Sequence, residues 1–329
     1  MSQISETQRL GAVFGSARSG STWLGAIVSS NPDVAYRFEP FHRLYYSPQL
    51  QAALNDEATT ETTDINTLYH ALLPAHPLAE KPPFFSKSYP MSMAAGRSLT
   101  WPLARKVPLG AWLFRQCYTP RSLPPVVFKE IGLVHLLKKL VPHIPVVYLM
   151  RHPCAVVWSM LRGQEQSLMP SDRRQFLQKL LRQRRPDLAS EFLHRCDRLS
   201  PAEQEALLWR IDTEIALDQI QSHANGLLVF YEDLVEQPLV VAARIFHHLG
   251  LPLSTESRIF IEESTLQASA RPVQRGEVGI NRYFTVFRDP KAACNKWKQQ
   301  MPATMRDRVM AIVGPSQSFA AGQQQGLWQ

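Results

Sequence analysis

The segment Gly15-Ser16-Ala17-Arg18-Ser19-Gly20-Ser21-Thr22 keeps the glycine spacing of a phosphate-binding loop but lacks that loop's lysine. ATP- and GTP-binding loops place a lysine directly after the second glycine, where this chain has Ser21. The cation stands three places upstream, at Arg18. An apolar run precedes the loop and a helical pattern follows it, so backbone N–H groups at a helix N-terminus can bind an anion. Because a guanidinium binds two oxygens at once, the segment predicts an anionic nucleotide held without a metal ion.

Short β-type runs alternate with helical patterns along the chain. Several are unbroken apolar runs, as strands buried on both faces require, so we expect an α/β fold with a P-loop-like parallel β-sheet flanked by helices. The expected strands are residues 11–14, 34–38, 126–129, 146–150 and 227–230. The clearest helix runs from Pro201 to about His223, with a capping box formed by Ser200 and Glu203.

Between about residues 47 and 125 the periodicity weakens, and proline and aromatic residues become frequent. The interpretation is one domain over residues 1–329 with a helical and aromatic insertion at 47–125. Such an insertion is often a lid or a substrate-binding region, and here we expect it to bind the acceptor. A peripheral helical subdomain that covers core surface is the other interpretation, and the two are compatible.

Composition narrows the possible partners and compartments. The net charge of +8 and pI near 9.4 suit an anionic ligand and would also suit nucleic acid, but no nucleic-acid-binding module is recognisable, so none is expected. The basic run from Arg173 to Arg185 is interpreted as a solvated helix face. No stretch approaches the length of a membrane span and the N-terminus is polar, which predicts a cytoplasmic protein. The spacing of the four cysteines indicates neither zinc nor disulfides, so they are expected to be reduced and mostly buried.

A second motif follows the expected strand 146–150. That strand ends in Arg151, a helix starts at Pro153, and Ser159 lies one to two turns along this helix. The arginine and the hydroxyl can therefore converge on one phosphate. A P-loop kinase would usually end this strand in a carboxylate that holds Mg²⁺, and here a cation takes that place.

Together with Tyr231-Glu232-Asp233-Leu234, these motifs resemble those of sulfotransferases that use 3′-phosphoadenosine 5′-phosphosulfate (PAPS), most closely the carbohydrate-sulfating type in a soluble bacterial form. The resemblance implies PAPS as co-substrate, no metal, and binding of the 3′-phosphate by Arg151 and Ser159. It also implies that Tyr231 lies near the adenine and that Trp23 stacks on it. The remaining implied donor-binding residues form the 5′-phosphosulfate loop: Arg18, Ser19, Gly20, Ser21 and Thr22.

The resemblance also bears on catalysis. Cytosolic sulfotransferases carry a histidine two residues after a strand-end lysine, where this chain has Lys129-Glu130-Ile131. Other branches place a glutamate after the second strand, as Glu39-Pro40 does here, so Glu39 is the preferred base over Glu130 and His42. Lys129 is expected to neutralise the transferring sulfonate or to form an ion pair with Glu130 or Glu39, and Arg18 completes the catalytic set. Arg288 and Lys291 are weaker candidates for a loop that closes over the nucleotide.

The predicted function is transfer of the sulfuryl group from PAPS to an acceptor hydroxyl by in-line displacement, with a glutamate as general base. The acceptor could be a sugar, a lipid or a small-molecule alcohol. A non-catalytic or degenerate nucleotide-binding protein is the alternative, and a P-loop kinase is less favoured. The sequence leaves the oligomeric state open.

Overall fold

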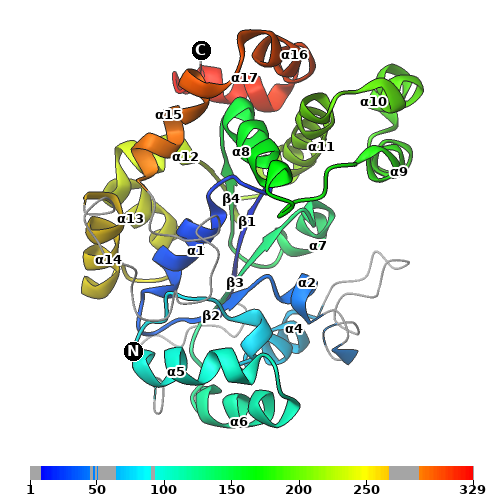
Figure 1. Cartoon of the computed structure of the whole chain (residues 1–329). Coiled ribbons are helices and arrows are strands. Elements are labelled where there is room, and N and C mark those ends of the chain that lie inside the picture. Colours follow the sequence, from blue (N-terminus) through cyan, green and yellow to red (C-terminus); the bar gives the residue numbers. More distant parts are fainter. Residues whose placement is uncertain are drawn as a thin grey trace.

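The computed structural model describes residues 9–44, 47–48, 50, 64–89, 93–266 and 289–328. At its centre lies a parallel sheet of five strands in the order β2-β3-β1-β4-β5. Figure 1 shows this sheet between two groups of helices. The strands are β1 Leu10–Gly15, β2 Ala35–Phe38, β3 Val126–Ile131, β4 Val146–Met150 and β5 Gly226–Phe230. This architecture confirms the expected fold class and all five strands, with β3 continuing two residues past the expected end and β2 starting one residue late.

The helices before β4 either connect successive strands or lie in the insertion. They are α1 Ser21–Ser29, α2 Pro40–Arg43, α4 Ile65–Leu72, the 3₁₀ helix η2 Pro77–Ala79, α5 Ala94–Ala104, α6 Pro108–Tyr118, η3 Val134–Leu136 and α7 Leu137–Leu140. Those after β4 are α8 Pro153–Glu165, α9 Arg174–Arg184, α10 Pro186–Phe192, η4 Leu193–Arg198, α11 Pro201–Gln221, α12 Tyr231–Glu236, α13 Pro238–His248, α14 Thr255–Leu266, α15 Pro290–Gln300, α16 Ala303–Val313 and α17 Gln317–Gln324.

The core divides along the two faces of the sheet because successive side chains of a strand point to opposite sides. On β1, Val13 packs with α1, α13 and α14, whereas Ala12 and Phe14 pack with α8, α11 and α16. Both faces are buried, which explains why the strands are apolar without interruption. Because all five strands are parallel, their carboxyl ends meet at one edge of the sheet. The polar motifs lie at this edge.

Helix α11 begins as expected: Ser200 Oγ accepts from the backbone N–H of Glu203, and the Glu203 carboxylate accepts from the backbone N–H of Ser200. It ends at Gln221, two residues before the expected end.

The basic run is a solvated face only in part, because Arg174 is exposed but two other arginines are not. Arg173 pairs with Glu205, and Arg185 pairs with Glu214; both carboxylates are buried on α11. These two arginines therefore attach the α9–α10 region to the core, while Arg182 remains exposed.

The cysteine prediction holds only in part. Cys154 and Cys196 are buried, and Cys117 and Cys294 are partly exposed, so half of the cysteines are buried rather than most. All four are free thiols.

Candidate active site

The phosphate-binding-type loop connects β1 to α1. Arg18 and Gly20 both have positive φ angles, 67° and 96°, and Gly20 is the N-cap of α1 with no side chain capping it. A Cβ added at Gly20 would lie 2.4 Å from the Tyr231 ring, so only glycine fits both the backbone and the contact. The helix N-terminus is therefore turned toward Tyr231 without a capping side chain, as an anion-binding loop requires.

Two arginines connect this loop to neighbouring segments. Arg18 Nε donates to Ser159 Oγ at 3.1 Å, and Arg151 Nη1 donates to the Arg18 carbonyl at 3.1 Å. Arg151 Nη2 donates to the Ala293 carbonyl at 2.6 Å, and the guanidinium carbon lies 4.5 Å from the centre of the Tyr231 ring. The loop, β4, α8, α12 and α15 thus meet at one place, and the structure brings Arg151 and Ser159 together through Arg18.

Aromatic side chains form one wall beside these cations. Trp23 and Tyr231 pack edge to face, with centroids 5.9 Å apart and planes at 73°. Trp23 Nε1 donates to Ser264 Oγ at 3.0 Å, which fixes the indole on α14. Both rings are buried against the apolar core.

A second polar cluster lies at the ends of β2 and β3. The register aligns Phe38 with Lys129, and the backbone N–H of Glu39 donates to the Lys129 carbonyl at 2.7 Å. Lys129 Nζ is 2.7 Å from Glu39 Oε1, and Arg43 lies 3.3 Å from Glu39 Oε2. Burial opposes ionisation of Glu39, but the charges of Lys129 and Arg43 outweigh it and lower the pKa of this carboxyl. Glu39 is therefore a carboxylate at neutral pH.

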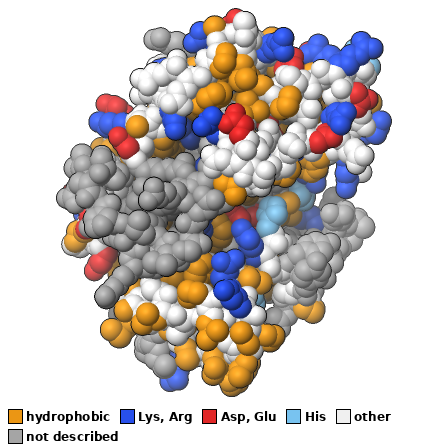
Figure 2. All heavy atoms as spheres, in the orientation of Figure 1, with side chains coloured by type: hydrophobic (Ala, Val, Ile, Leu, Met, Phe, Trp, Pro, Cys, Tyr) orange, Lys and Arg blue, Asp and Glu red, His pale blue; other side chains and the backbone are white. Residues whose placement is uncertain are grey.

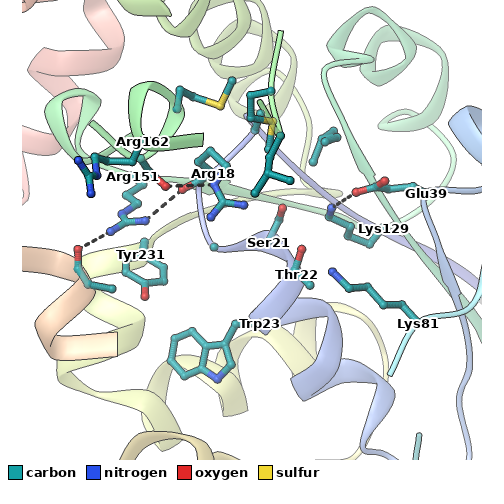
Figure 3. A pocket seen from close by; sticks show the side chains of 18 of the residues that line it. Arg18, Ser21, Thr22, Trp23, Glu39, Lys81, Lys129, Arg151, Arg162 and Tyr231 are labelled. Atoms are coloured by element: carbon teal, nitrogen blue, oxygen red, sulfur yellow. Dashed lines mark hydrogen bonds and ion pairs between the residues drawn. The ribbon is translucent and has the colours of Figure 1, made fainter. Parts of the chain in front are cut away.

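Lys81 also belongs to this cluster, and no motif in the sequence indicated it; it lies in the insertion, directly before a Pro-Pro pair. Its ammonium lies 4.9 Å from the centre of the Phe38 ring, and Lys129 Nζ is 4.8 Å from the same ring. Burial, together with the neighbouring charge of Lys129, lowers the pKa of Lys81 to about 7. Figure 3 shows its side chain pointing toward the space between Thr22 and Lys129.

The two alternative bases have structural partners. Glu130 is fully buried, accepts from the backbone N–H groups of Phe41 and Ile131, and pairs with His42 Nδ1. The hydrogen bond to Glu130 raises the pKa of His42. Neither residue lines the cavity between the two clusters. Of the two ion pairs expected for Lys129, the structure has the one with Glu39.

A cavity of about 1040 Å³ joins the two polar clusters. In Figure 3, Arg18, Arg151 and Tyr231 lie on one side of it, Glu39 and Lys129 on the other, and Ser21 and Thr22 between them. All the expected site residues except Ser19 line this cavity. Ser19 is fully buried, and its backbone N–H donates to the Ser16 carbonyl. The Ser19 side chain lies against Gly15 instead, because a Cβ added at Gly15 would be only 2.6 Å from Ser19 Oγ.

The cavity also has walls that the motifs did not indicate. Residues of the insertion and of two later helices contribute to it: Leu78, Glu80, Lys81, Trp101, Arg105, Trp158, Arg162 and Lys296. Of the two weaker candidates, Lys291 is exposed on α15 and lies outside the cavity lining, whereas Lys296, one to two turns later, contributes to it. Arg288 lies outside the described residues.

The described part of the chain holds no cluster of three or more His, Cys, Asp or Glu side chains arranged to bind a metal ion. None of the helices formed by the described residues combines the length and hydrophobicity that crossing a bilayer requires.

Comparison with known proteins assigns the family. A family model described as the sulfotransferase family matches residues 12–255, so the chain belongs to the sulfotransferase family. The match begins within β1, extends past β5 and includes the expected site residues from Arg18 to Tyr231, and it confirms the resemblance drawn from the motifs. The chain is accordingly a sulfotransferase-type enzyme.

Similar solved structures include three sulfotransferases. The sulfotransferase domain from the Synechococcus PCC 7002 olefin synthase is 15% identical, with a TM-score of 0.47 over 92% of each chain. The sulfotransferase domain from the curacin biosynthetic pathway is 15% identical, with a TM-score of 0.49 over 97% of each chain. Mouse sulfotransferase SULT7A1 complexed with PAP is 12% identical, with a TM-score of 0.47 over 97% of this chain and 88% of that one. These likenesses are distant, and the assignment rests on the family model. A search of curated proteins found no significant match.

Proposed function

We propose that this sulfotransferase transfers the sulfuryl group of PAPS to an acceptor hydroxyl, with Glu39 as the general base. The observation that carries the proposal is one cavity with an anion-binding loop and two arginines on one side and a carboxylate–lysine pair on the other. One side suits a nucleotide with two anionic groups, and the other suits the reacting oxygen.

The donor side fits such a nucleotide. The uncapped start of α1, with Ser21 and Thr22, would hold the 5′-phosphosulfate, while Arg151 and Ser159 would hold the 3′-phosphate. Arg151 Nε is buried without a hydrogen-bond partner among the described residues. Buried donors are normally paired, which supports the proposal that Arg151 binds an anionic group of the donor. Trp23 and Tyr231, whose planes meet at 73°, would each offer an aromatic ring to the adenine.

In the chemical step the acceptor oxygen attacks the sulfur in line, an O–S bond forms, and the S–O bond to the phosphate breaks. The acceptor proton passes to the Glu39 carboxylate, and 3′-phosphoadenosine 5′-phosphate (PAP) leaves with the bond electrons. Arg18 and Lys129, with Lys81 when it is protonated, provide positive charge for the sulfonate and the leaving phosphate. Lys129 has a second effect, because it keeps Glu39 ionised and therefore able to accept a proton.

We further propose that the insertion, residues 47–125, binds the acceptor. Leu78, Trp101 and Arg105 come from this part of the chain and line the cavity. Arg105 lies close enough to Arg43 for their charges to interact, and Arg43 pairs with Glu39, so this wall lies near the proposed base, where the acceptor hydroxyl must approach.

Glu39→Gln tests the role of the base. The amide keeps the size of the carboxylate and one accepting oxygen but cannot take up the acceptor proton, so turnover should fall roughly 10²–10⁴-fold while PAP affinity stays near that of the wild type. Glu130→Gln is the matched control, since it changes a neighbouring strand-end carboxylate outside the cavity, and it should keep its turnover. An active Glu39→Gln enzyme, with chemistry limiting the rate, would rule out this base.

A further inference from the structure

Helices α5 and α6 form a hairpin whose inner side is a small separate core. Residues 105–107 connect the helices. Trp101 and Ala104 of α5 pack with Phe114 and Tyr118 of α6. Trp101 Nε1 donates to the Pro77 carbonyl at 2.8 Å, which ties the hairpin to the rest of the insertion.

The outer side of the same hairpin is also apolar and is exposed. Leu99 is 81% exposed, Leu109 65%, Leu103 64% and Trp112 55%. Met93, Val107 and Leu113 extend this surface. Figure 2 shows the hydrophobic side chains gathered at the lower end of the molecule, where Figure 1 places α5 and α6. A helix that is apolar on both sides is expected to be buried on both, so this outer face indicates an apolar partner.

The charge around the outer face identifies the chemistry of that partner. Residues 81–129 contain eight Lys and Arg and no Asp or Glu. Four of these cations are exposed on or beside the hairpin: Arg105, Lys106, Arg115 and Arg121. A second copy of the chain on this face would bring two sets of positive charges together. An anionic lipid surface offers both an apolar phase for the protruding side chains and negative charge for the cations.

We propose that the α5–α6 hairpin docks on membranes that contain anionic lipid, and that the acceptor is an amphipathic alcohol resident in that membrane. The second half rests on the proposed function. It is supported by the position of the hairpin, because Trp101 and Arg105 line the cavity and the Arg105 guanidinium lies 4.7 Å from the Trp101 ring. One helix thus contributes both to the exposed apolar face and to the cavity wall on the Glu39 side, and an amphiphile would reach the base without leaving the lipid surface.

Sedimentation with lipid vesicles tests the docking. The wild type should bind vesicles of phosphatidylcholine and phosphatidylglycerol, bind pure phosphatidylcholine more weakly, and dissociate as salt is raised. The triple variant Leu103→Ser, Leu109→Ser, Trp112→Ser should lose at least about tenfold in vesicle affinity. Charge reversal by Lys106→Glu with Arg115→Glu should lose a similar factor.

Matched controls lie on other helices. Val240→Ser removes a side chain that is 65% exposed on α13, and Arg258→Glu reverses an exposed charge on α14; both should bind vesicles like the wild type. The docking would be overturned if the wild type failed to bind anionic vesicles. It would also be overturned if the triple variant bound them with the affinity of the wild type. Self-association of the wild type that the triple variant abolishes would also overturn it, by making the face an interface between copies.

PAP binding, measured on the same samples, separates this proposal from the proposed function. Wild-type protein that binds PAP but not anionic vesicles contradicts the docking alone, whereas wild-type protein that binds vesicles but has no affinity for PAP contradicts the proposed function alone. For the acceptor, sulfur-labelled PAPS is incubated with the membrane and the soluble fractions of the source cells. Label in the lipid extract of the membranes, reduced several-fold in the triple variant, is expected. Label confined to the soluble fraction would refute a membrane acceptor, and label in neither would refute sulfuryl transfer.

Discussion

The substitution Lys129→Met tests the electrostatic coupling between Lys129 and Glu39. Lys129 is 1% exposed and Glu39 8%, so the substitution leaves a buried carboxylate whose remaining neighbour on the other oxygen is the half-exposed Arg43. Removing one partner of a buried ion pair costs about 3–5 kcal/mol. Protonation of Glu39 limits this loss: with an ordinary pKa of about 4.3, taking up a proton at pH 7 costs about 2.7 × 1.36, or about 3.7 kcal/mol. We expect the free energy of unfolding to fall by about 3 kcal/mol at pH 7.

The stability difference between the wild type and Lys129→Met should depend on pH. In the wild type the pKa of Glu39 is lowered in the folded state, so its stabilising contribution is present above the unfolded pKa and is lost as the pH falls through the folded pKa. In Lys129→Met the folded pKa of Glu39 should instead lie above the unfolded value, so the difference between the two proteins should shrink as the pH falls from 7 toward about 4. Urea unfolding at several pH values measures this difference.

A double-mutant cycle completes the assay. Glu39→Gln with Lys129→Met removes both charges and should be more stable than the sum of the two single losses predicts. A loss below about 1 kcal/mol that does not change with pH, or strictly additive losses, would refute the coupling between these two residues.

Two further predictions concern the donor. Arg151→Ala should weaken binding of PAP by about 1.5–3 kcal/mol, and Ser159→Ala by less, with little change for 5′-AMP; calorimetry that shows equal losses for both nucleotides would move these residues away from the 3′-phosphate. An anion bound beside Lys81 should raise the pKa of this lysine from about 7, so PAP binding near pH 8 should take up a proton that Lys81→Met does not, measurable by calorimetry in buffers of different ionisation enthalpy. Identical proton uptake by the variant would place the titrating group elsewhere.

Much of the scaffold could be predicted because buried parallel strands leave a direct pattern in the sequence. The apolar runs predicted all five strands, Gly20 marked the start of α1, and Arg151 marked the end of β4. The pairing of Glu39 with Lys129 was one of two expectations, because choosing it needs the order of the strands, which places β2 beside β3.

Other parts of the site depend on tertiary packing and left no local signal. Lys81 lies in an irregular segment far along the chain from Phe38, and its position beside that ring follows from the folding of the insertion. Ser19 fits the loop pattern, but its side chain is turned inward, because a pattern of residue types does not state which hydroxyl faces the ligand.

Calorimetric titration with PAP in the presence of EDTA tests whether this cavity is the PAPS site. We expect PAP to bind without divalent metal and 5′-AMP, which lacks the 3′-phosphate, to bind far more weakly. PAP at 100 times its dissociation constant should also add about 2.7 kcal/mol to the free energy of unfolding. Loss of PAP binding in EDTA, or equal binding of ATP with Mg²⁺, would contradict the assignment of this cavity to PAPS.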